Sequence, residues 1–210
     1  DSNSRAVRLT EQANGTYTFV MPASDATVEA VFQIRPAFTD VPSGSYYEDA
    51  VLWAVGEGIT MGISAQAFAP DGSCTRAQAV TFLWRAAGSP APVSAKTRFA
   101  DVAASSYYSD AVLWAVENGI TNGTSDTTFS PDAVCTRAQI VAFLWRAKGR
   151  PAAGSGSRFA DVAETAYYAD AVLWAVKEGV TLGTSANAFS PDETCTRAQI
   201  VTFLWRTLAK

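Results

Sequence analysis

The chain has 210 residues, of which 48% are hydrophobic, with a formal net charge of −4 and a sequence pI of about 4.8. This composition is typical of a globular protein with a sizeable core, and an acidic chain without a basic run is not expected to bind nucleic acid. No stretch reaches the roughly 20 apolar residues of a membrane span, so we expect no membrane insertion.

Histidine is absent, which removes the commonest general base and the commonest metal ligand. The three cysteines, Cys74, Cys135 and Cys195, occupy the same place in three similar segments, without the CxxC spacing of a zinc site. We therefore predict no metal site, no cofactor and no catalytic residue. The thiols should be unpaired, and should act as small hydrophobic groups beneath the helices that follow them.

Residues 1–36 differ from the rest of the chain. Apolar and polar residues alternate over 16–21 and again over 27–34, on either side of a Pro-Ala-Ser-Asp turn. This alternation predicts two strands joined in a β-hairpin. Because two strands alone are marginally stable, we interpret this segment as the C-terminal strands of a truncated β-domain. It is similar to the closing hairpin of small β-repeats of Gram-positive surface proteins.

From residue 37 onward the chain repeats itself. An Asp-Val pair recurs at Asp40, Asp101 and Asp161, a period of about 60 residues. We divide the chain into repeats at 37–90, 98–150 and 158–210, joined by linkers rich in Pro, Ala, Gly and Ser. Each unit is too small to be comfortably stable alone. The three should therefore bury their helices against one another.

Each repeat should begin with a helix over its Tyr-Tyr segment. In the first repeat Tyr47, Val51 and Ala54 share one face of this helix, which is apolar over much of its circumference. A glycine follows in the place of a left-handed C-cap, at Gly58, Gly119 and Gly179. A short loop and a Pro-Asp turn then lead to the second helix.

The second helix is marked by a Thr, a Gln three residues later and then an apolar run. In such a capping box the Thr hydroxyl accepts from the N–H of the third helical residue, and the Gln side chain reaches back to the N–H of the Thr. The pairs are Thr75 and Gln78, Thr136 and Gln139, and Thr196 and Gln199.

An arginine follows each capping Thr, at Arg76, Arg137 and Arg197. By this register it stands at the first helical position, where the helix dipole disfavours a cation by about 0.3–1 kcal/mol. One explanation is an anion site, in which Arg and free helix N–H groups bind a carboxylate together. The alternative is an ion pair with an acid of the preceding turn. The candidates for that pair are Asp71, Asp132 and Asp192.

These motifs resemble those of S-layer homology domains. Five recur in the same order in all three copies, across residues 37–210: Phe-x-Asp-Val, Tyr-Tyr-x-Asp-Ala-Val, Gly-Ile/Val-Thr-x-Gly, Phe-x-Pro-Asp and Thr-Arg-Ala-Gln. The chain departs from the family where the last motif ends in Gln instead of Glu, and where Cys precedes its Thr. Gln preserves the capping box but removes a negative charge.

The resemblance implies a mainly α fold, with three repeats in a pseudo-threefold arrangement around a central three-helix bundle and a short N-terminal β-hairpin. It implies an extracellular module on the surface of a Gram-positive-type bacterium, which anchors non-covalently to an acidic, pyruvylated secondary cell-wall polysaccharide through grooves between lobes. We expect it to be monomeric. The ligand-binding residues that it implies are Arg76, Arg137, Arg197, Thr75, Thr136, Thr196, Gln78, Gln139, Gln199, Gly62, Gly123 and Gly183.

Two other functions compete with this one. Hydrolysis of a glycan needs a pair of acids, for which Asp40 and Asp71 qualify by residue type alone. Three similar sites suit multivalent binding better, so we predict that the chain is not an enzyme. The other alternative is a protein-interaction or lattice-assembly module of a surface layer, in which the apolar first helix contacts a second chain.

Overall fold

The computed structural model describes residues 10–12, 17–20, 38–156 and 159–209 of two units, Asp1–Gln33 and Ile34–Lys210. In the first unit, β1 (Thr10–Glu11) pairs antiparallel with β2 (Tyr17–Thr18). β2 lies in the strand predicted at 16–21, but its partner β1 was not predicted. The second predicted strand, 27–34, lies outside the described residues, and the truncated β-domain stays a prediction.

The described part of the second unit contains six helices, two in each repeat, so the prediction of a mainly α chain is confirmed. They are α1 (Glu48–Gly56), α2 (Arg76–Ala86), α3 (Ser109–Glu117), α4 (Arg137–Ala147), α5 (Ala169–Lys177) and α6 (Arg197–Leu208). The predicted C-cap glycines are also found, since Gly58, Gly119 and Gly179 have φ between +63° and +71°.

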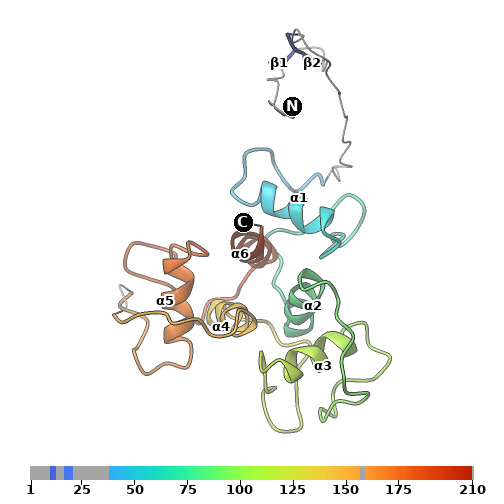
Figure 1. Cartoon of the computed structure of the whole chain (residues 1–210), viewed down its shortest axis with the longest axis vertical. Coiled ribbons are helices and arrows are strands. Elements are labelled where there is room, and N and C mark those ends of the chain that lie inside the picture. Colours follow the sequence, from blue (N-terminus) through green and yellow to red (C-terminus); the bar gives the residue numbers. More distant parts are fainter. Residues whose placement is uncertain (1–9, 13–16, 21–37, 157–158, 210) are drawn as a thin grey trace, which may run out of the picture. The chain divides into compact units, whose positions relative to one another are not determined.

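The helices pack mainly across the boundaries between repeats. α3 packs on α2 and α5 packs on α4, so each of these first helices is buried by the second helix of the preceding repeat. α1 packs on α6 in the same way, and this contact joins the third repeat to the first. The second helices α2, α4 and α6 also contact one another, with the first helices outside them (Figure 1).

Apolar side chains fill the space between the three second helices. They surround a cavity of about 10 Å³, which is about large enough for one water molecule. The residues around it are Ala79, Leu83, Ile140, Phe143, Leu144, Ile200 and Leu204. Ala79 stands where the other two repeats have Ile140 and Ile200, so α2 contributes the smallest side chain at this position.

The residues before the capping threonines form a closed ring of backbone hydrogen bonds. The N–H of Cys74 donates to the carbonyl of Cys195, Cys195 donates to Cys135, and Cys135 donates to Cys74, over 2.9 to 3.2 Å. All three thiols are free and fully buried. The prediction that they are unpaired, small buried groups is therefore confirmed.

Because of the buried thiols, we expect the fold to lose stability at alkaline pH. Burial raises the pKa of Cys74 and of Cys135 to about 12, against about 8.5 in an unfolded chain. The folded state therefore holds these protons more tightly. The stability that they contribute is complete below about pH 8.5 and falls as the pH rises towards 12.

We expect the free energy of unfolding in urea to fall between pH 9 and pH 11 more steeply than in a variant with all three cysteines replaced by Val. Val fills the same sites without an ionisable group, so the variant removes the titration of the thiols and keeps every other ionisable side chain. Equal slopes in the two proteins would contradict the assignment of this pH dependence to the thiols.

Candidate functional site

The capping boxes form as predicted. In the first repeat the hydroxyl of Thr75 accepts from the backbone N–H of Gln78 over 3.3 Å, and the Gln78 side-chain oxygen accepts from the N–H of Thr75 over 3.1 Å. The same pairs of bonds occur at Thr136 with Gln139 and at Thr196 with Gln199. These six side chains are thus committed to helix capping, and their contact with a ligand remains a prediction.

The first amides of the second helices are not free. The N–H of Arg76 donates to the carbonyl of Ala133 over 2.8 Å, and the N–H of Ala77 donates to Pro131 over 3.0 Å. The corresponding amides of α4 and α6 donate to the equivalent turns of the third and first repeats. The assumption of free helix N–H groups is therefore wrong. A ligand at these helix starts would meet side chains instead.

The three arginines are buried and each reaches into the next repeat. Arg76 is 4% exposed, and its Nε donates to the carbonyl of Phe129 over 2.9 Å. Its guanidinium carbon lies 4.9 Å from the centre of the Phe129 ring and 5.6 Å from that of Phe143, distances at which a cation is attracted by an aromatic face. Arg137 donates to Phe189 and Arg197 to Phe68 in the same way.

The acids near these arginines come from the Asp-Val motif of the next repeat. Burial lowers the pKa of Arg76, while the charge of Asp101 is among the influences that raise it. The same motif places Asp161 by Arg137 and Asp40 by Arg197, and Glu193 also acts on Arg137. Among the described residues, the acids that act on each arginine thus belong to the next repeat. The predicted ion pair with an acid in the preceding turn of the same repeat is not found there.

Each Asp-Val carboxylate also holds the loop that carries the carbonyl acceptor of the arginine. Asp101 accepts from the N–H of Phe129 over 2.9 Å and of Ser130 over 2.7 Å. Burial acts to raise the pKa of the equivalent Asp40, but the amides of Phe68 and Ala69 outweigh it and its pKa lies below the usual value. The acid therefore positions the carbonyl to which the arginine donates.

Part of each guanidinium group is left without a strong partner. The Nη2 atoms of Arg137 and Arg197 are buried and have no hydrogen-bond partner among the described residues, and Arg76 Nη2 lies 3.5 Å from the hydroxyl of Thr121. An unsatisfied buried donor costs about 1–3 kcal/mol and more when it is charged. These donors therefore keep unused hydrogen-bonding capacity within the site.

The glycines predicted as ligand contacts have a packing role. Gly62 has a φ of +82°, and a Cβ at this position would lie 2.7 Å from both the Phe38 ring and the carbonyl oxygen of Ala67. Gly123 and Gly183 stand in equivalent contacts with Phe99 and Phe159. These glycines are required for the close approach of the loop and the Phe of the Phe-x-Asp-Val motif. Their contact with a ligand remains a prediction.

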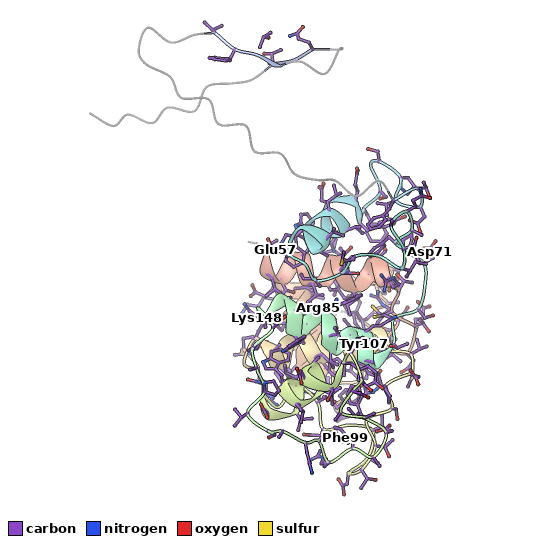
Figure 2. All side chains as sticks on the ribbon, turned by 90° about the vertical axis from the view of Figure 1, so that its right-hand side faces the viewer. Glu57, Asp71, Arg85, Phe99, Tyr107 and Lys148 are labelled. Atoms are coloured by element: carbon purple, nitrogen blue, oxygen red, sulfur yellow. The ribbon has the colours of Figure 1, made fainter. Side chains whose placement is uncertain are left out.

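The structure adds two side chains that the sequence analysis did not select, a tyrosine and a second arginine. Tyr167 is 59% exposed. Burial raises its pKa, while the charges of Arg146 and Arg76 act to lower it, so arginines of the first and second repeats influence a tyrosine of the third. Arg85 and Tyr107 occupy equivalent positions on α2 and beside α3 (Figure 2). The repeated Tyr-Tyr and Phe-Leu-Trp-Arg motifs could have indicated both.

Neither a metal centre nor a membrane span is found in the part of the chain that the structure describes. No three acidic, Cys or His side chains in it are grouped to hold a metal ion. None of its helices combines the length and the apolar character that crossing a bilayer requires.

Comparison with known proteins identifies the repeats. The family described as S-layer homology domain matches residues 37–80, 98–141 and 158–201. The surface-layer 125 kDa protein of Lysinibacillus sphaericus is 32% identical over 78% of this chain, and the S-layer protein of Bacillus thuringiensis subsp. finitimus is 26% identical over 92%. The chain spans 14% and 24% of the lengths of these two relatives. An endoglucanase of Bacillus sp. (strain KSM-635) is 33% identical over 49% of this chain and 11% of its own length.

The packing role of the glycines can be tested with a matched pair of variants in the first repeat. Gly62→Ala should lower the free energy of unfolding by about 2–4 kcal/mol, because it combines a strained backbone with overlap against Phe38. Gly44→Ala, at a φ of +80° with nothing within 4 Å of the added Cβ, should cost only about 1 kcal/mol. Chemical denaturation measures both. Equal losses would remove the argument for close packing at Gly62.

Proposed function

The chain belongs to the S-layer homology domain family, and from this premise we propose that it anchors a surface protein to an acidic, pyruvylated polysaccharide of the cell wall. Membership makes it a cell-wall anchoring or surface-layer module of an extracellular protein of a Gram-positive-type bacterium. The identity of the polysaccharide and the residues that bind it are the parts that we propose.

The buried arginines carry this proposal. Arg137 and Arg197 each keep a buried Nη2 without a partner among the described residues, although the same guanidinium is held firmly through Nε and two aromatic rings. A carboxylate is the group that best completes a guanidinium, since it accepts two parallel hydrogen bonds. We therefore assign the anionic groups of the glycan to these arginines.

The proposal extends to the arrangement of the repeats and to the rest of the site. We propose that the repeats 37–90, 98–150 and 158–210 are related by a pseudo-threefold axis, with α2, α4 and α6 as a central bundle. The mutual contacts of these three helices support this arrangement. Each groove would then combine an arginine of one repeat, the Thr of the Gly-Ile-Thr loop in the next, and the exposed tyrosine of the third.

Binding is favoured over the two alternatives by specific contacts. The Asp-Val acids, which are candidates for catalysis by residue type, accept backbone amides and so act as structural groups. The apolar face of α1 is already packed on α6, which removes the main reason to expect a second chain there. Lattice assembly remains the second candidate, because two of the relatives are named as surface-layer proteins.

Binding itself can be tested with purified cell-wall polymer. The unaltered chain should be retained by the polymer, and retention should fall after chemical removal of its acidic substituents. Light scattering with and without the polymer separates this outcome from lattice assembly, in which the chain would self-associate without any glycan. Undiminished retention on the neutralised polymer would exclude an anionic ligand.

Replacing all three arginines by Lys should weaken binding of an acidic wall fragment. Lys cannot reproduce the guanidinium fork, and one lost charge-assisted contact is worth roughly 1.5–3 kcal/mol, or about ten- to a hundredfold in affinity. On the sequence alone, the triple Arg→Lys variant is expected to keep its fold. The Nε bonds to the next repeat and the ring contacts now predict a loss of stability as well.

In calorimetric titration, the triple variant should therefore be compared with a control variant that is also less stable but keeps its arginines. Val112→Ala removes fully buried methyl groups from α3 without touching an arginine, and should cost about 2 kcal/mol. It should keep its affinity while the triple variant loses it. Unchanged affinity in a folded triple variant would return the arginines to a purely structural role.

A further inference from the structure

The loop of the second repeat that follows α3, residues 119–122, is contacted by four arginines, one at each residue. The donor and acceptor atoms are Arg150 Nη2 and Gly119 O at 2.7 Å, Arg146 Nη1 and Ile120 O at 3.0 Å, Arg76 Nη2 and Thr121 Oγ1 at 3.5 Å, and Arg98 Nη2 and Asn122 O at 2.8 Å. We call Arg76, Arg98, Arg146 and Arg150 the arginine cluster.

Among the described residues, two acids near the cluster, Asp101 and Glu117, already accept backbone amides. Burial lowers the pKa of Arg146, and the charge of Arg150 lowers it further, so these two cations lie close enough to repel each other. Asp101 acts on Arg76, but its two oxygens already accept backbone amides. Glu117, at the end of α3, is likewise occupied by two linker amides. An added anion would relieve this repulsion.

Arg150 is held against the loop by its backbone. It has a φ of +54°, a region that non-glycine residues rarely adopt, and its N–H donates to the carbonyl of Trp145 over 2.9 Å. Its guanidinium lies over Gly119, where an added Cβ would be 3.2 Å from Nη2. This backbone conformation follows the glycine that ends the helix, and it fixes where the Arg150 side chain leaves the chain.

The first repeat provides a natural comparison. Its corresponding loop, residues 58–61, has Arg85 bonded to the carbonyl of Ile59 and the Nη2 of Arg197 without a partner among the described residues. The positions that correspond to Arg98 and Arg150 hold Ala37 and Ser89, the latter with the same φ of +54°. The first loop therefore lacks two of the four cations. The matching positions of the third repeat hold Arg158 and Lys210, which keep both charges in the sequence but lie outside the described residues.

We propose that the loop at 119–122 is a subsite for a highly charged part of the glycan, a segment with carboxylates on two neighbouring sugar units. This inference rests on the proposed function. Arg76 is the buried donor for one carboxylate, as in the other repeats. The exposed Arg98 and Arg150 at the two ends of the loop are the donors for the neighbouring one, and Arg146 adds its charge between them.

The test exchanges the cluster for the residues of the first repeat. Arg150→Ser and Arg98→Ala should each weaken binding of acidic wall polymer and of trigalacturonate, which carries a carboxylate on every sugar, by about three- to tenfold at low ionic strength. Both should also make binding less sensitive to salt. Ser89→Arg, which builds the missing cation into the first repeat, should strengthen binding. Titration calorimetry at two salt concentrations measures all of these changes.

Lys148→Ala is the matched control. It removes one positive charge from an exposed side chain in the same segment as Arg150, and Ala87 stands at the corresponding place in the first repeat. Its affinity should change less than twofold. The inference is overturned if Arg150→Ser and Arg98→Ala behave like this control while the unaltered chain binds and the triple Arg→Lys variant is weakened. Unchanged affinity in the triple variant, or no binding by the unaltered chain, would overturn the proposed function and this inference with it.

Discussion

The hydrogen bond from a buried arginine to a carbonyl of the next repeat is the contact on which the assembly of the repeats depends. Arg76 donates to Phe129, Arg137 to Phe189 and Arg197 to Phe68. Burying a cation costs several kcal/mol unless it is well partnered. Here the carbonyl, two aromatic faces and a nearby carboxylate share that role. Because the same guanidinium group joins two repeats and carries the proposed ligand contact, an anion bound to it would also stabilise the assembled fold.

Local structure could be read from the sequence because its causes are local. The capping boxes need only a Thr and a Gln three residues apart, and Gly58 ends α1 because its backbone takes a positive φ. The apolar face of the first helix was equally visible. Its partner was not, since periodicity shows that a face is buried but not by which repeat. α1 packs on α6, at the far end of the repeat region.

The site was harder to predict, because its side chains act over long separations in the sequence. The position of Arg76 at a helix start drew attention to it, but nothing nearby indicates a carbonyl acceptor at Phe129. The amides of α2 were taken as free because their acceptors belong to the turn of the next repeat, at Ala133 and Pro131. Gly62 was assigned to ligand contact, and the structure adds a packing role against the Phe38 ring and the Ala67 carbonyl. Its packing role depends on two motifs that only folding brings together.

The contact of α1 with α6 has a consequence for biosynthesis. A ribosome makes α1 before α6, so the apolar face of α1 has no partner until the third repeat has been produced. α3 and α5 each follow the helix that covers them, and can be buried as soon as they are made. A chain truncated before α6 would therefore leave α1 exposed, as a surface that proteases and chaperones recognise. The contact between α1 and α6 thus links the presence of the third repeat to the survival of the first.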